Sequence, residues 1–315
     1  MDNLAILIPC YNEEETIAKV INDCKSAAKE IRNTKIYVYD NNSTDRTVEI
    51  AQENGAIVKH EYMQGKGNVI RRMFREVNAK AYIMIDGDDT YPASEIPKMT
   101  QLILENGNDM VVGDRLSSSY FEENKRPFHG IGNIIVRKCI NLFFKNDIRD
   151  IMTGYRAFSY KFVKSYPVLS KGFEIETEMS IFATVNNLSI VNHVIDYKDR
   201  PEGSYSKLNT YSDGLRVLKL ILNLYRNYKP LNFFSILTFV LILLSLIFFI
   251  PDVWLPYQNT GKVDALPTLI VCGFCVITAI ISFYSGLILD SIQRKERREF
   301  EFRLQEINNN FTNIK

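Results

Sequence analysis

Short runs of apolar, β-favouring residues alternate with helical patterns over the first part of the chain. The runs lie at residues 4–8, 36–40, 56–59, 82–86 and 110–113. Between them apolar residues recur every three or four positions, as in residues 17–28, which is the spacing of one buried helix face. Strands that alternate with helices in this way are typical of a sheet covered by helices. The pattern therefore predicts an α/β fold with a mostly parallel sheet flanked by helices.

Two of these helices have ends that can be placed from the sequence. Asn12 is expected to cap the first helix, with Glu15 reaching back to it. The second helix is expected to begin near residues 43–45 and to stop at Asn54-Gly55, where glycine readily supplies a left-handed residue.

The pattern changes after residue 230, where much of the 46% hydrophobic content is concentrated. Residues 231–250 carry no charge, and residues 265–289 form a second, longer uncharged run. At about 1.5 Å per residue, the first run is long enough to cover the roughly 30 Å hydrocarbon core of a bilayer. The alternative is a buried helix of a soluble protein, but such helices seldom stay uncharged for this length. We therefore expect two transmembrane helices joined by a short external loop.

Basic residues lie before the first apolar run and after the second, and few lie in the loop between them. Arg216, Lys219, Arg226 and Lys229 precede the first run, Arg294, Lys295, Arg297 and Arg298 follow the second, and the loop has Lys262 with Asp252 and Asp264. By the positive-inside rule, both termini are expected to be cytoplasmic. The expected organisation is a cytoplasmic domain at 1–211, an amphipathic juxtamembrane helix at 212–230, transmembrane helices within 231–289 around loop 251–264, and a cytoplasmic helical tail at 290–315.

Charge and cysteine content exclude several classes of protein. Lys and Arg number 38 against 37 for Asp and Glu, so the chain lacks the polybasic body of a nonspecific nucleic-acid binder. The 5 cysteines are odd in number and scattered, which argues against a disulfide scaffold or a zinc site.

Acids and amides follow several of the predicted strands. Ligands bind beyond the carboxyl ends of the strands in such sheets, so these positions are candidate site residues. The densest group is Asp86-Gly87-Asp88-Asp89. Three carboxylates this close repel one another unless a cation compensates them, and Mg²⁺ or Mn²⁺ commonly shares its coordination with substrate phosphates. We interpret the group as a seat for a divalent cation and a diphosphate.

Several short motifs occur together in the order of a known family. They are the segments 8–14 (IPCYNEE), 39–45 (YDNNSTD), 65–67 (GKG) with Arg71, 86–89 (DGDD), 113–115 (GDR), 153–158 (TGYRAF), 171–178 (KGFEIETE) and 200–204 (RPEGS). Any one is weak alone. Jointly they resemble family-two glycosyltransferases of the GT-A fold, within them dolichyl-phosphate mannose synthases and bacterial polyprenyl-phosphate glycosyltransferases. The resemblance covers residues 3–230, and the bacterial members share the two-span tail.

The resemblance implies roles for residues on the donor side. Nucleotide binding would fall to Pro9, Tyr11, Glu13, Asp40, Lys66 and Asp86, with Asp40 recognising the base. Asp86 and Asp88 would be the metal pair, with Asp88 the direct ligand of Mg²⁺ or Mn²⁺. One departure stands out, because the family's usual Asp-Asp-Gly-Ser turn is replaced by residues 40–43 (DNNS).

On the acceptor side the resemblance implies a set of cations. The catalytic residues would be the acid Asp88 with the cations Arg115, Arg156 and Arg200. An acceptor phosphate would be bound by Arg115, Arg200 and Lys207, because guanidinium groups bind phosphate oxygens through a planar fork. Lys66 and Arg71 are further candidates. The alternative is that any one of these residues is a surface charge or pairs with a carboxylate such as Glu178, which could equally orient Arg156.

The expected activity is metal-dependent, inverting transfer of one hexose from a nucleotide-sugar to a polyprenyl phosphate in the cytoplasmic leaflet of a bacterial inner or plasma membrane. UDP-hexose is the first expectation for the donor, and GDP-mannose is its rival. The product would serve cell-envelope glycan or glycoprotein modification. No nucleic acid is expected as a partner, and a homo-oligomer is reasonable.

Two other functions fit parts of the sequence, and two segments outside the apolar hairpin are candidates for membrane binding. A processive polysaccharide synthase would carry a Gln-x-x-Arg-Trp motif, but the only tryptophan is Trp254 in the external loop. A noncatalytic membrane scaffold with a glycosyltransferase fold is the second alternative. Residues 128–145 and 212–229 mix apolar with basic side chains and are expected to be interfacial helices, although ordinary packing is equally open for the first.

Overall fold

The computed structural model describes residues 1–117, 147–172, 174–196, 219 and 221–314. The chain divides into two compact units, Met1–Leu220 with Phe302–Lys315 and Ile221–Glu301. Each unit is described by itself below. The predicted sequence boundary at residues 211 and 212, and the predicted interfacial segment 128–145, lie outside the described residues.

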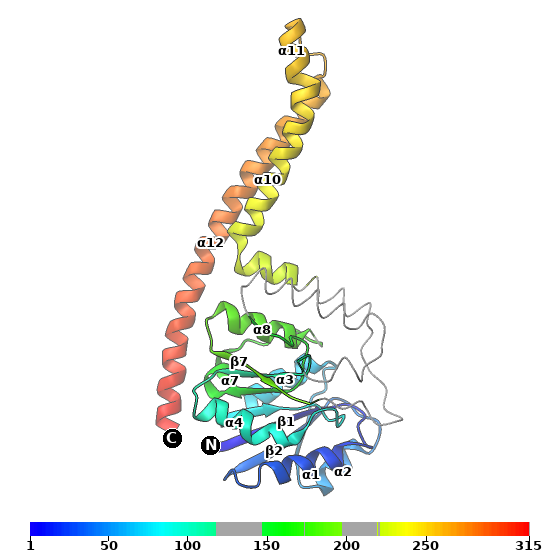
Figure 1. The fold of residues 1–315 in the computed structure, drawn as a ribbon, viewed down its shortest axis with the longest axis vertical. Helices are drawn as coiled ribbons and strands as arrows, with labels where there is room; N and C mark the ends of the chain where they lie inside the picture. Colours follow the sequence, from blue (N-terminus) through cyan, green and yellow to red (C-terminus); the bar gives the residue numbers. More distant parts are fainter. Residues whose placement is uncertain (118–146, 173, 197–218, 220, 315) are drawn as a thin grey trace. The chain divides into compact units, whose positions relative to one another are not determined.

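The first unit is built on one sheet of seven strands in the order β3-β2-β1-β4-β6-β5-β7. Among these strands, β1, β2 and β7 are labelled in Figure 1. The strands are β1 (Asp2–Cys10), β2 (Thr34–Asp40), β3 (Ile57–His60), β4 (Ala79–Met84), β5 (Met110–Asp114), β6 (Arg156–Ser159) and β7 (Ile190–Val194). β6 runs antiparallel to β4 and β5, and the other neighbouring pairs are parallel. The mostly parallel sheet predicted from the sequence is therefore confirmed.

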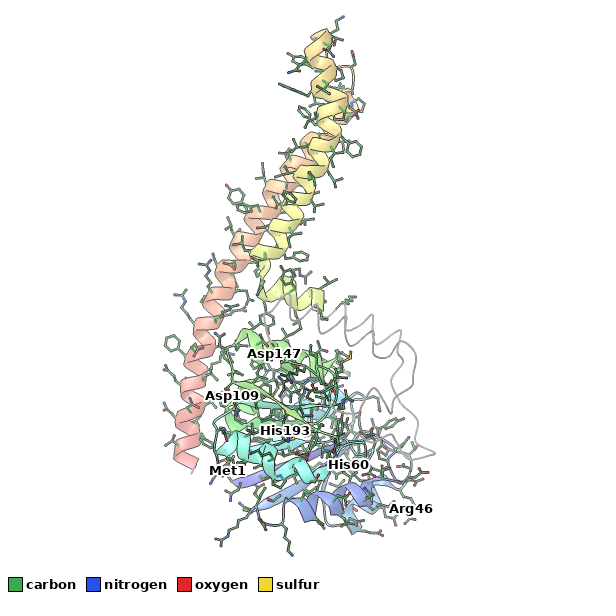
Figure 2. The ribbon with its side chains drawn as sticks, viewed as in Figure 1. Met1, Arg46, His60, Asp109, Asp147 and His193 are labelled. Atoms are coloured by element: carbon green, nitrogen blue, oxygen red, sulfur yellow. The ribbon has the colours of Figure 1, made fainter. Side chains whose placement is uncertain are left out.

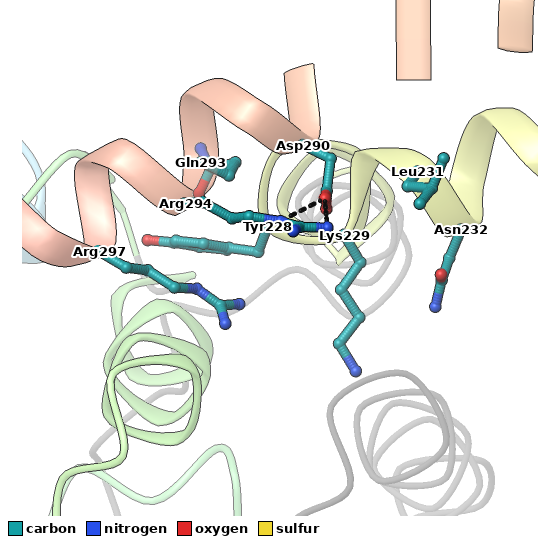
Figure 3. A pocket seen from close by; sticks show the side chains of 8 residues that line it. All are labelled: Tyr228, Lys229, Leu231, Asn232, Asp290, Gln293, Arg294 and Arg297. Atoms are coloured by element: carbon teal, nitrogen blue, oxygen red, sulfur yellow. Dashed lines mark hydrogen bonds and ion pairs between the residues drawn. The ribbon is translucent and has the colours of Figure 1, made fainter. Parts of the chain in front are cut away.

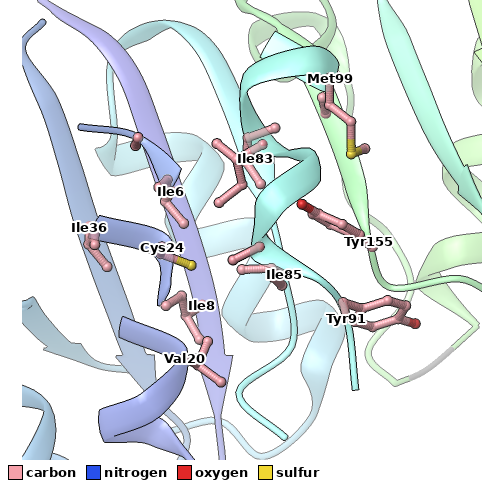
Figure 4. Packing of buried hydrophobic residues seen from close by; sticks show 14 of the residues in the cluster. Ile6, Ile8, Val20, Cys24, Ile36, Ile83, Ile85, Tyr91, Met99 and Tyr155 are labelled. Carbon is pink, nitrogen blue, oxygen red and sulfur yellow. The ribbon is translucent and has the colours of Figure 1, made fainter. Parts of the chain in front are cut away.

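Helices connect and cover these strands. They are α1 (Ile17–Ala27), α2 (Thr47–Glu53), α3 (Lys66–Glu76), the short 3₁₀ helix η1 (Ala93–Glu95), α4 (Ile96–Leu104), α7 (Tyr160–Ser165) and α8 (Ile175–Val185). Figure 4 shows Val20 and Cys24 of α1 lying against Ile6 and Ile8 of β1. The predicted helix face is thus the buried one. Each such aliphatic side chain stabilises the fold by roughly 1.5–3 kcal/mol relative to an exposed one.

The predicted end of α2 is correct, although α2 begins at Thr47, after the predicted start near residues 43–45, and the predicted cap of α1 is wrong. α2 ends at Glu53, and Gly55 has the left-handed φ of +68° that the sequence predicted. α1 begins after Thr16, without a side-chain cap. Asn12 instead has a φ of 54° and accepts a hydrogen bond from the N–H of Thr44 at 2.8 Å, because its side chain turns toward the loop after β2.

The second unit contains the two apolar helices. Residues 221–228 are helical, followed by α10 (Pro230–Phe249), the π-helical segment η2 (Ile250–Trp254) and α11 (Leu255–Thr260). α12 (Leu266–Ile314) then runs back and continues without a break through the predicted tail. Both α10 to α11 and α12 are long and apolar enough to cross a membrane, and most of the apolar window of each is exposed. The direction in which they cross stays a prediction.

Small residues recur along the contact between α10 and α12. The Thr238 hydroxyl donates to the carbonyl of Ala279 at 3.1 Å, and the Ser245 hydroxyl donates to the carbonyl of Cys272 at 3.2 Å. A Cβ atom added at Gly286 would lie 2.9 Å from that of Phe234, so the backbones approach closely there too. Positions 272, 279 and 286 are seven residues apart, which is the spacing of one seam between paired helices.

Candidate active site

The carboxyl ends of three parallel strands meet at one edge of the sheet. Cys10 at the end of β1 pairs with Asp40 at the end of β2, and Leu7 pairs with Met84 at the end of β4. The acidic segment 86–89 follows β4 directly and packs on the start of α1. The Thr16 hydroxyl donates to the carbonyl of Gly87 at 2.6 Å. The fold therefore places the acidic cluster beside the residues that follow β1.

Each carboxylate of the cluster has its own partner in the protein. Asp86 accepts from Lys66 at 2.7 Å, and Asp89 accepts from the exposed Lys19 at 2.6 Å. Asp88 is buried, and one of its oxygens accepts from both the N–H and the hydroxyl of Thr90, at 3.3 and 2.6 Å. Lysines thus compensate two of the three charges. Repulsion among the three carboxylates therefore does not by itself require a metal ion. The argument from the sequence, that only a bound cation could compensate them, was wrong.

Lys66 lies between two carboxylates from distant parts of the chain. Its Nζ is 2.7 Å from Asp86 Oδ1 and 2.8 Å from Glu176 Oε1. Burial alone would lower the pKa of Lys66, but the two carboxylates raise it above its ordinary value, so the ammonium stays charged. Burial raises the pKa of Glu176 while Lys66 opposes that change. Glu176, on the buried face of α8, is a site residue that the sequence did not single out.

The glycines beside Lys66 allow two loops to touch through their backbones. The N–H of Gly67 donates to the carbonyl of Lys171 at 2.9 Å, and a Cβ at Gly65 would lie only 2.2 Å from that same oxygen. Gly65 also has a φ of +127°. Arg71 ties the same loop down by donating to the carbonyl of Val168 at 2.9 Å. The two glycines of the GKG motif therefore allow close backbone packing, which fixes the position of Lys66.

Asp86 and Arg115 are linked by a short chain of contacts. A Cβ at Gly154 would lie 2.3 Å from Asp86 Oδ2, and the Gly154 N–H donates to the Tyr91 hydroxyl at 3.0 Å. The Arg115 guanidinium lies 5.8 Å from the centre of the Tyr91 ring. Arg115 also binds Asp150 with Nε at 2.7 Å and Nη2 at 3.1 Å. A predicted acceptor-side cation is thus held at the same edge as the acidic cluster by a buried carboxylate.

Arg156 is placed differently from what the sequence predicted. Its side chain is fully buried and donates to Ile151 O at 2.7 Å, Thr153 O at 3.1 Å and Ser180 Oγ at 3.0 Å. Burial lowers the pKa of Arg156 to about 10, so it remains charged at neutral pH. A phosphate has no access to a guanidinium with no exposed surface. Arg156 therefore supports the segment before β6 and does not contact the acceptor. Glu178 accepts from the N–H of Ser170 at 2.8 Å.

The residues predicted to hold the nucleoside lie at the ends of β1 and β2. Pro9 and Glu13 are half-buried, and Tyr11 is 37% exposed. Asp40 is buried, accepts from the N–H of Ser43 at 3.2 Å, and lies 3.4 Å from His60 Nδ1. His60 ends β3 and is labelled in Figure 2. These placements leave the nucleoside-binding roles as predictions.

Asn41 explains why the chain departs from the family turn. Its buried amide donates to the carbonyls of Glu61 at 2.8 Å and Met63 at 3.0 Å, and its Oδ1 accepts from the Gly65 N–H at 2.7 Å. A carboxylate cannot donate to two carbonyls. The loop that leads to Lys66 is therefore matched to an asparagine at this position.

The sequence predicted Asp86 and Asp88 as the ligands of a divalent cation at this edge, and that role stays a prediction. Among the described residues, no group of three or more His, Cys, Asp or Glu side chains could hold a metal ion. Two carboxylates still fit a cation that completes its coordination with water and substrate phosphates, as Mg²⁺ commonly does. Arg200 and Lys207 lie outside the described residues.

Comparison with known proteins identifies the family. The model described as glycosyl transferase family 2 matches residues 5–166. Glycosyltransferase AglJ of Haloferax volcanii is 32% identical over 306 residues, which cover 95% of this chain and 98% of AglJ. The dolichyl-phosphate hexose transferase of the same organism is 27% identical over 220 residues, covering 70% of this chain and 92% of its own.

A solved structure shares the fold. Glucosyl-3-phosphoglycerate synthase from Mycobacterium tuberculosis, crystallised with Mn²⁺, UDP-glucose and phosphoglyceric acid, has a TM-score of 0.56 at 18% identity and covers 71% of this chain and 80% of its own. The family match spans more than half of this chain, and AglJ aligns with almost all of it. The chain therefore belongs to glycosyl transferase family 2.

Proposed function

We propose that this protein is a membrane-bound, inverting glycosyltransferase that moves one sugar from a nucleotide-sugar, first of all a UDP-hexose, to a polyprenyl phosphate at the cytoplasmic leaflet. The observation that carries this proposal is the edge formed by Asp86, Asp88 and Lys66 in a family-two domain whose chain also has two membrane-length helices. The similarity to a protein named dolichyl-phosphate hexose transferase supports a polyprenyl phosphate as the acceptor. The neighbour holding Mn²⁺ and UDP-glucose supports the donor class and a divalent cation.

On the donor side, the residues at this edge would place a divalent cation and an ammonium against the diphosphate. Asp86 and Asp88 would hold Mg²⁺ or Mn²⁺, which supplies positive charge to the departing nucleoside diphosphate when bound. Lys66 presents a second positive charge beside Asp86, and Glu176 keeps its ammonium in place. Pro9, Tyr11, Glu13 and Asp40 form the nucleoside end of the site in this proposal.

On the acceptor side, Arg115, Arg200 and Lys207 bind the lipid phosphate. Asp150 fixes the Arg115 guanidinium through two hydrogen bonds, so its orientation is set before the acceptor arrives. A phosphate monoester has a second pKa of about 6 and is largely ionised at neutral pH, so the nucleophile needs no catalytic base.

The reaction is a single displacement. An acceptor phosphate oxygen forms a bond to the anomeric carbon, and the bond from that carbon to the diphosphate oxygen breaks. The electron pair leaves with the nucleoside diphosphate. Attack from the side opposite the leaving group inverts the anomeric configuration. The lipid-linked sugar formed in this way would serve cell-envelope glycan or glycoprotein modification.

The test uses the purified full chain in detergent with a short polyprenyl phosphate and a panel of UDP- and GDP-sugars. Parallel reactions contain Mg²⁺, Mn²⁺ or a chelator, and the lipid product is identified by mass and its anomer by NMR. We expect one hexose per lipid, inverted configuration, and loss of transfer with the chelator. Products of steadily increasing mass would indicate a processive synthase instead.

Asp88→Asn supplies the variant arm, and Asp89→Asn is its matched control. Asp88 is buried at the proposed cation site, whereas Asp89 pairs with the exposed Lys19. We expect Asp88→Asn to abolish transfer with an unchanged circular dichroism spectrum and Asp89→Asn to keep most of it. Full transfer by Asp88→Asn, or a product that retains the donor's configuration, would refute the proposal.

A further inference from the structure

A cavity of about 270 Å³ lies within the second unit, at the end of the helix pair where α10 begins (Figure 3). It is lined by Tyr228, Lys229, Leu231, Asn232, Asp290, Gln293, Arg294 and Arg297. None of these residues takes part in the proposed transfer reaction. The lining comes from α12 and from both sides of the start of α10, so the cavity is formed only when the two helices pair.

The lining carries a net positive charge. Lys229, Arg294 and Arg297 bring three positive charges against one negative charge from Asp290. Arg294 donates to Asp290 from both Nε, at 2.9 Å, and Nη2, at 2.7 Å, and both bonds go to the single oxygen Oδ2. The lining residues together therefore carry a formal charge of +2. Asn232 and Gln293 add neutral hydrogen-bonding groups to the same lining.

The cavity lies at the level where both helices change from apolar to polar. On α10 the uncharged run begins immediately after Lys229, and on α12 it ends at Leu289, one residue before Asp290. In a bilayer this level is that of the lipid headgroups, where basic side chains meet anionic phosphates. The volume is slightly below the roughly 300–1,000 Å³ typical of small-molecule sites. It suits a phosphate-bearing headgroup better than a nucleotide-sugar.

We propose that this cavity binds the phosphate of an anionic phospholipid headgroup, with Arg297, Arg294 and Lys229 as its cationic contacts. The site then fixes the base of the helix pair at the leaflet surface. This inference rests on the proposed function only in placing α10 and α12 in a membrane. It does not depend on glycosyl transfer.

The experiment counts lipids bound to the full-length protein in detergent by native mass spectrometry. The probes are phosphatidylglycerol, phosphatidylcholine, a short polyprenyl phosphate and inorganic phosphate. The test variant is Arg294→Gln with Arg297→Gln. The matched control is Lys295→Gln with Arg298→Gln, which removes the same charge from α12 at positions that do not line the cavity. Arg297→Gln alone keeps the Arg294–Asp290 pair intact.

We expect phosphatidylglycerol to bind in preference to phosphatidylcholine. Each basic residue near an anionic lipid contributes roughly a fivefold change in affinity, so the double cavity variant should bind at least about tenfold more weakly and the single variant about fivefold. The control variant should bind like the wild type. Equal weakening in both double variants would show diffuse surface attraction and overturn the site, and so would no weakening in either.

The remaining arms separate the sources of the phosphate and the two proposals. Binding of polyprenyl phosphate alone, or displacement of the phospholipid by millimolar inorganic phosphate, would overturn the assignment to a phospholipid headgroup. The cavity variants should still transfer sugar to the short acceptor in detergent. Asp88→Asn should lose that transfer and still bind phosphatidylglycerol, so failure of one proposal is distinguishable from failure of the other.

Discussion

The Lys66 ammonium lies 2.7 Å from an oxygen of Asp86, the first acid of the cluster after β4. Glu176 lies 2.8 Å from the same ammonium on its other side and is buried. A buried cation between two carboxylates is held in place by both, and removal of one partner leaves an uncompensated charge. Because the three residues come from α3, the segment after β4, and α8, this contact also joins separate parts of the first unit.

Lys66→Met should destabilise the protein by about 3–5 kcal/mol, because it leaves the carboxylates of Asp86 and Glu176 without their cationic partner at a site with little access to water. In a Glu176→Gln background one of those charges is already gone, so the cost of Lys66→Met should be smaller by about 1–2 kcal/mol. Urea denaturation of the single and double variants in detergent measures this coupling. Glu174→Gln, on the neighbouring turn, is the control. Additive effects of the two changes would contradict the arrangement.

Asn41→Asp should destabilise the protein although it restores the family's usual acid. The change removes two hydrogen-bond donors and places a carboxylate against the carbonyls of Glu61 and Met63, at a cost of about 2–3 kcal/mol. The loop that leads to Lys66 should loosen, so KM for the nucleotide-sugar should rise. Urea denaturation and donor titration test both effects.

The neighbouring Asn42→Asp is the control for this change. The Asn42 amide also donates to a carbonyl, that of Tyr62 at 3.0 Å, but the side chain is exposed and water can replace the bond. An Asn41→Asp protein as stable as the wild type would show that the buried amide is not required.

Gly154→Ala should displace Asp86. The added Cβ would lie 2.3 Å from Asp86 Oδ2, so the carboxylate must move or the strand must shift. Overpacking of this kind costs about 1–3 kcal/mol. A displacement of about 1 Å at a reacting site lowers turnover by about 100-fold. Gly273→Ala is the control, because nothing lies within 4 Å of a Cβ there, and its transfer rate should be unchanged. Normal turnover by Gly154→Ala would contradict the close contact.

Glu76 should make stability depend on pH in acid. Burial alone would raise its pKa, but hydrogen bonds from Lys59, Arg72 and Tyr39 lower it to about 2, below the ordinary 4.5. Because the folded-state pKa is the lower one, Glu76 stabilises the fold fully above about pH 5, and this contribution is lost as pH falls from 4.5 towards 2. With its side chain 29% exposed, the contribution is roughly 1–2 kcal/mol.

Urea denaturation of wild type and Glu76→Gln at pH 7 and pH 3 checks this dependence. The difference between the two proteins should be present at pH 7 and clearly smaller at pH 3. Glu49→Gln, which removes an exposed partner of Arg46, should show little difference at either pH. A Glu76→Gln difference that is the same at both pH values would rule out the carboxylate as its source.

The strands with apolar runs were predictable, and the remaining ones were not. β1 to β5 each overlap a run of β-favouring residues, and a polar residue lies at the end of the run or just after it. β6 has four residues and starts with Arg156, and a buried cation gives no apolar signal. β7 has no fully buried residue, and its His193, labelled in Figure 2, lies 2.7 Å from Glu95. The sequence therefore missed the antiparallel strand that completes the sheet.

The acidic edge of the site was predictable, but the partners of its charges were not. Asp86 and Asp88 follow a recognisable strand, so their place at the sheet edge could be foreseen. Glu176 and Asp150 lie far along the chain from Lys66 and Arg115, and only the folded backbone brings them together. For Glu176 the sequence offered one signal, its place within the segment 171–178 that carries the family resemblance.

The paired positions of α10 and α12 limit how this hairpin can change in length. Thr238 contacts Ala279, and Ser245 contacts Cys272. The two contacts are therefore seven residues apart on each of the two antiparallel helices. Loss of one residue from either helix between these contacts would rotate every later side chain by about 100° out of the seam. Loss of seven from both would restore it and shorten the pair by roughly 10 Å. Between these contacts, the helix pair can therefore change in length and keep its seam only by matched, two-turn changes in both helices.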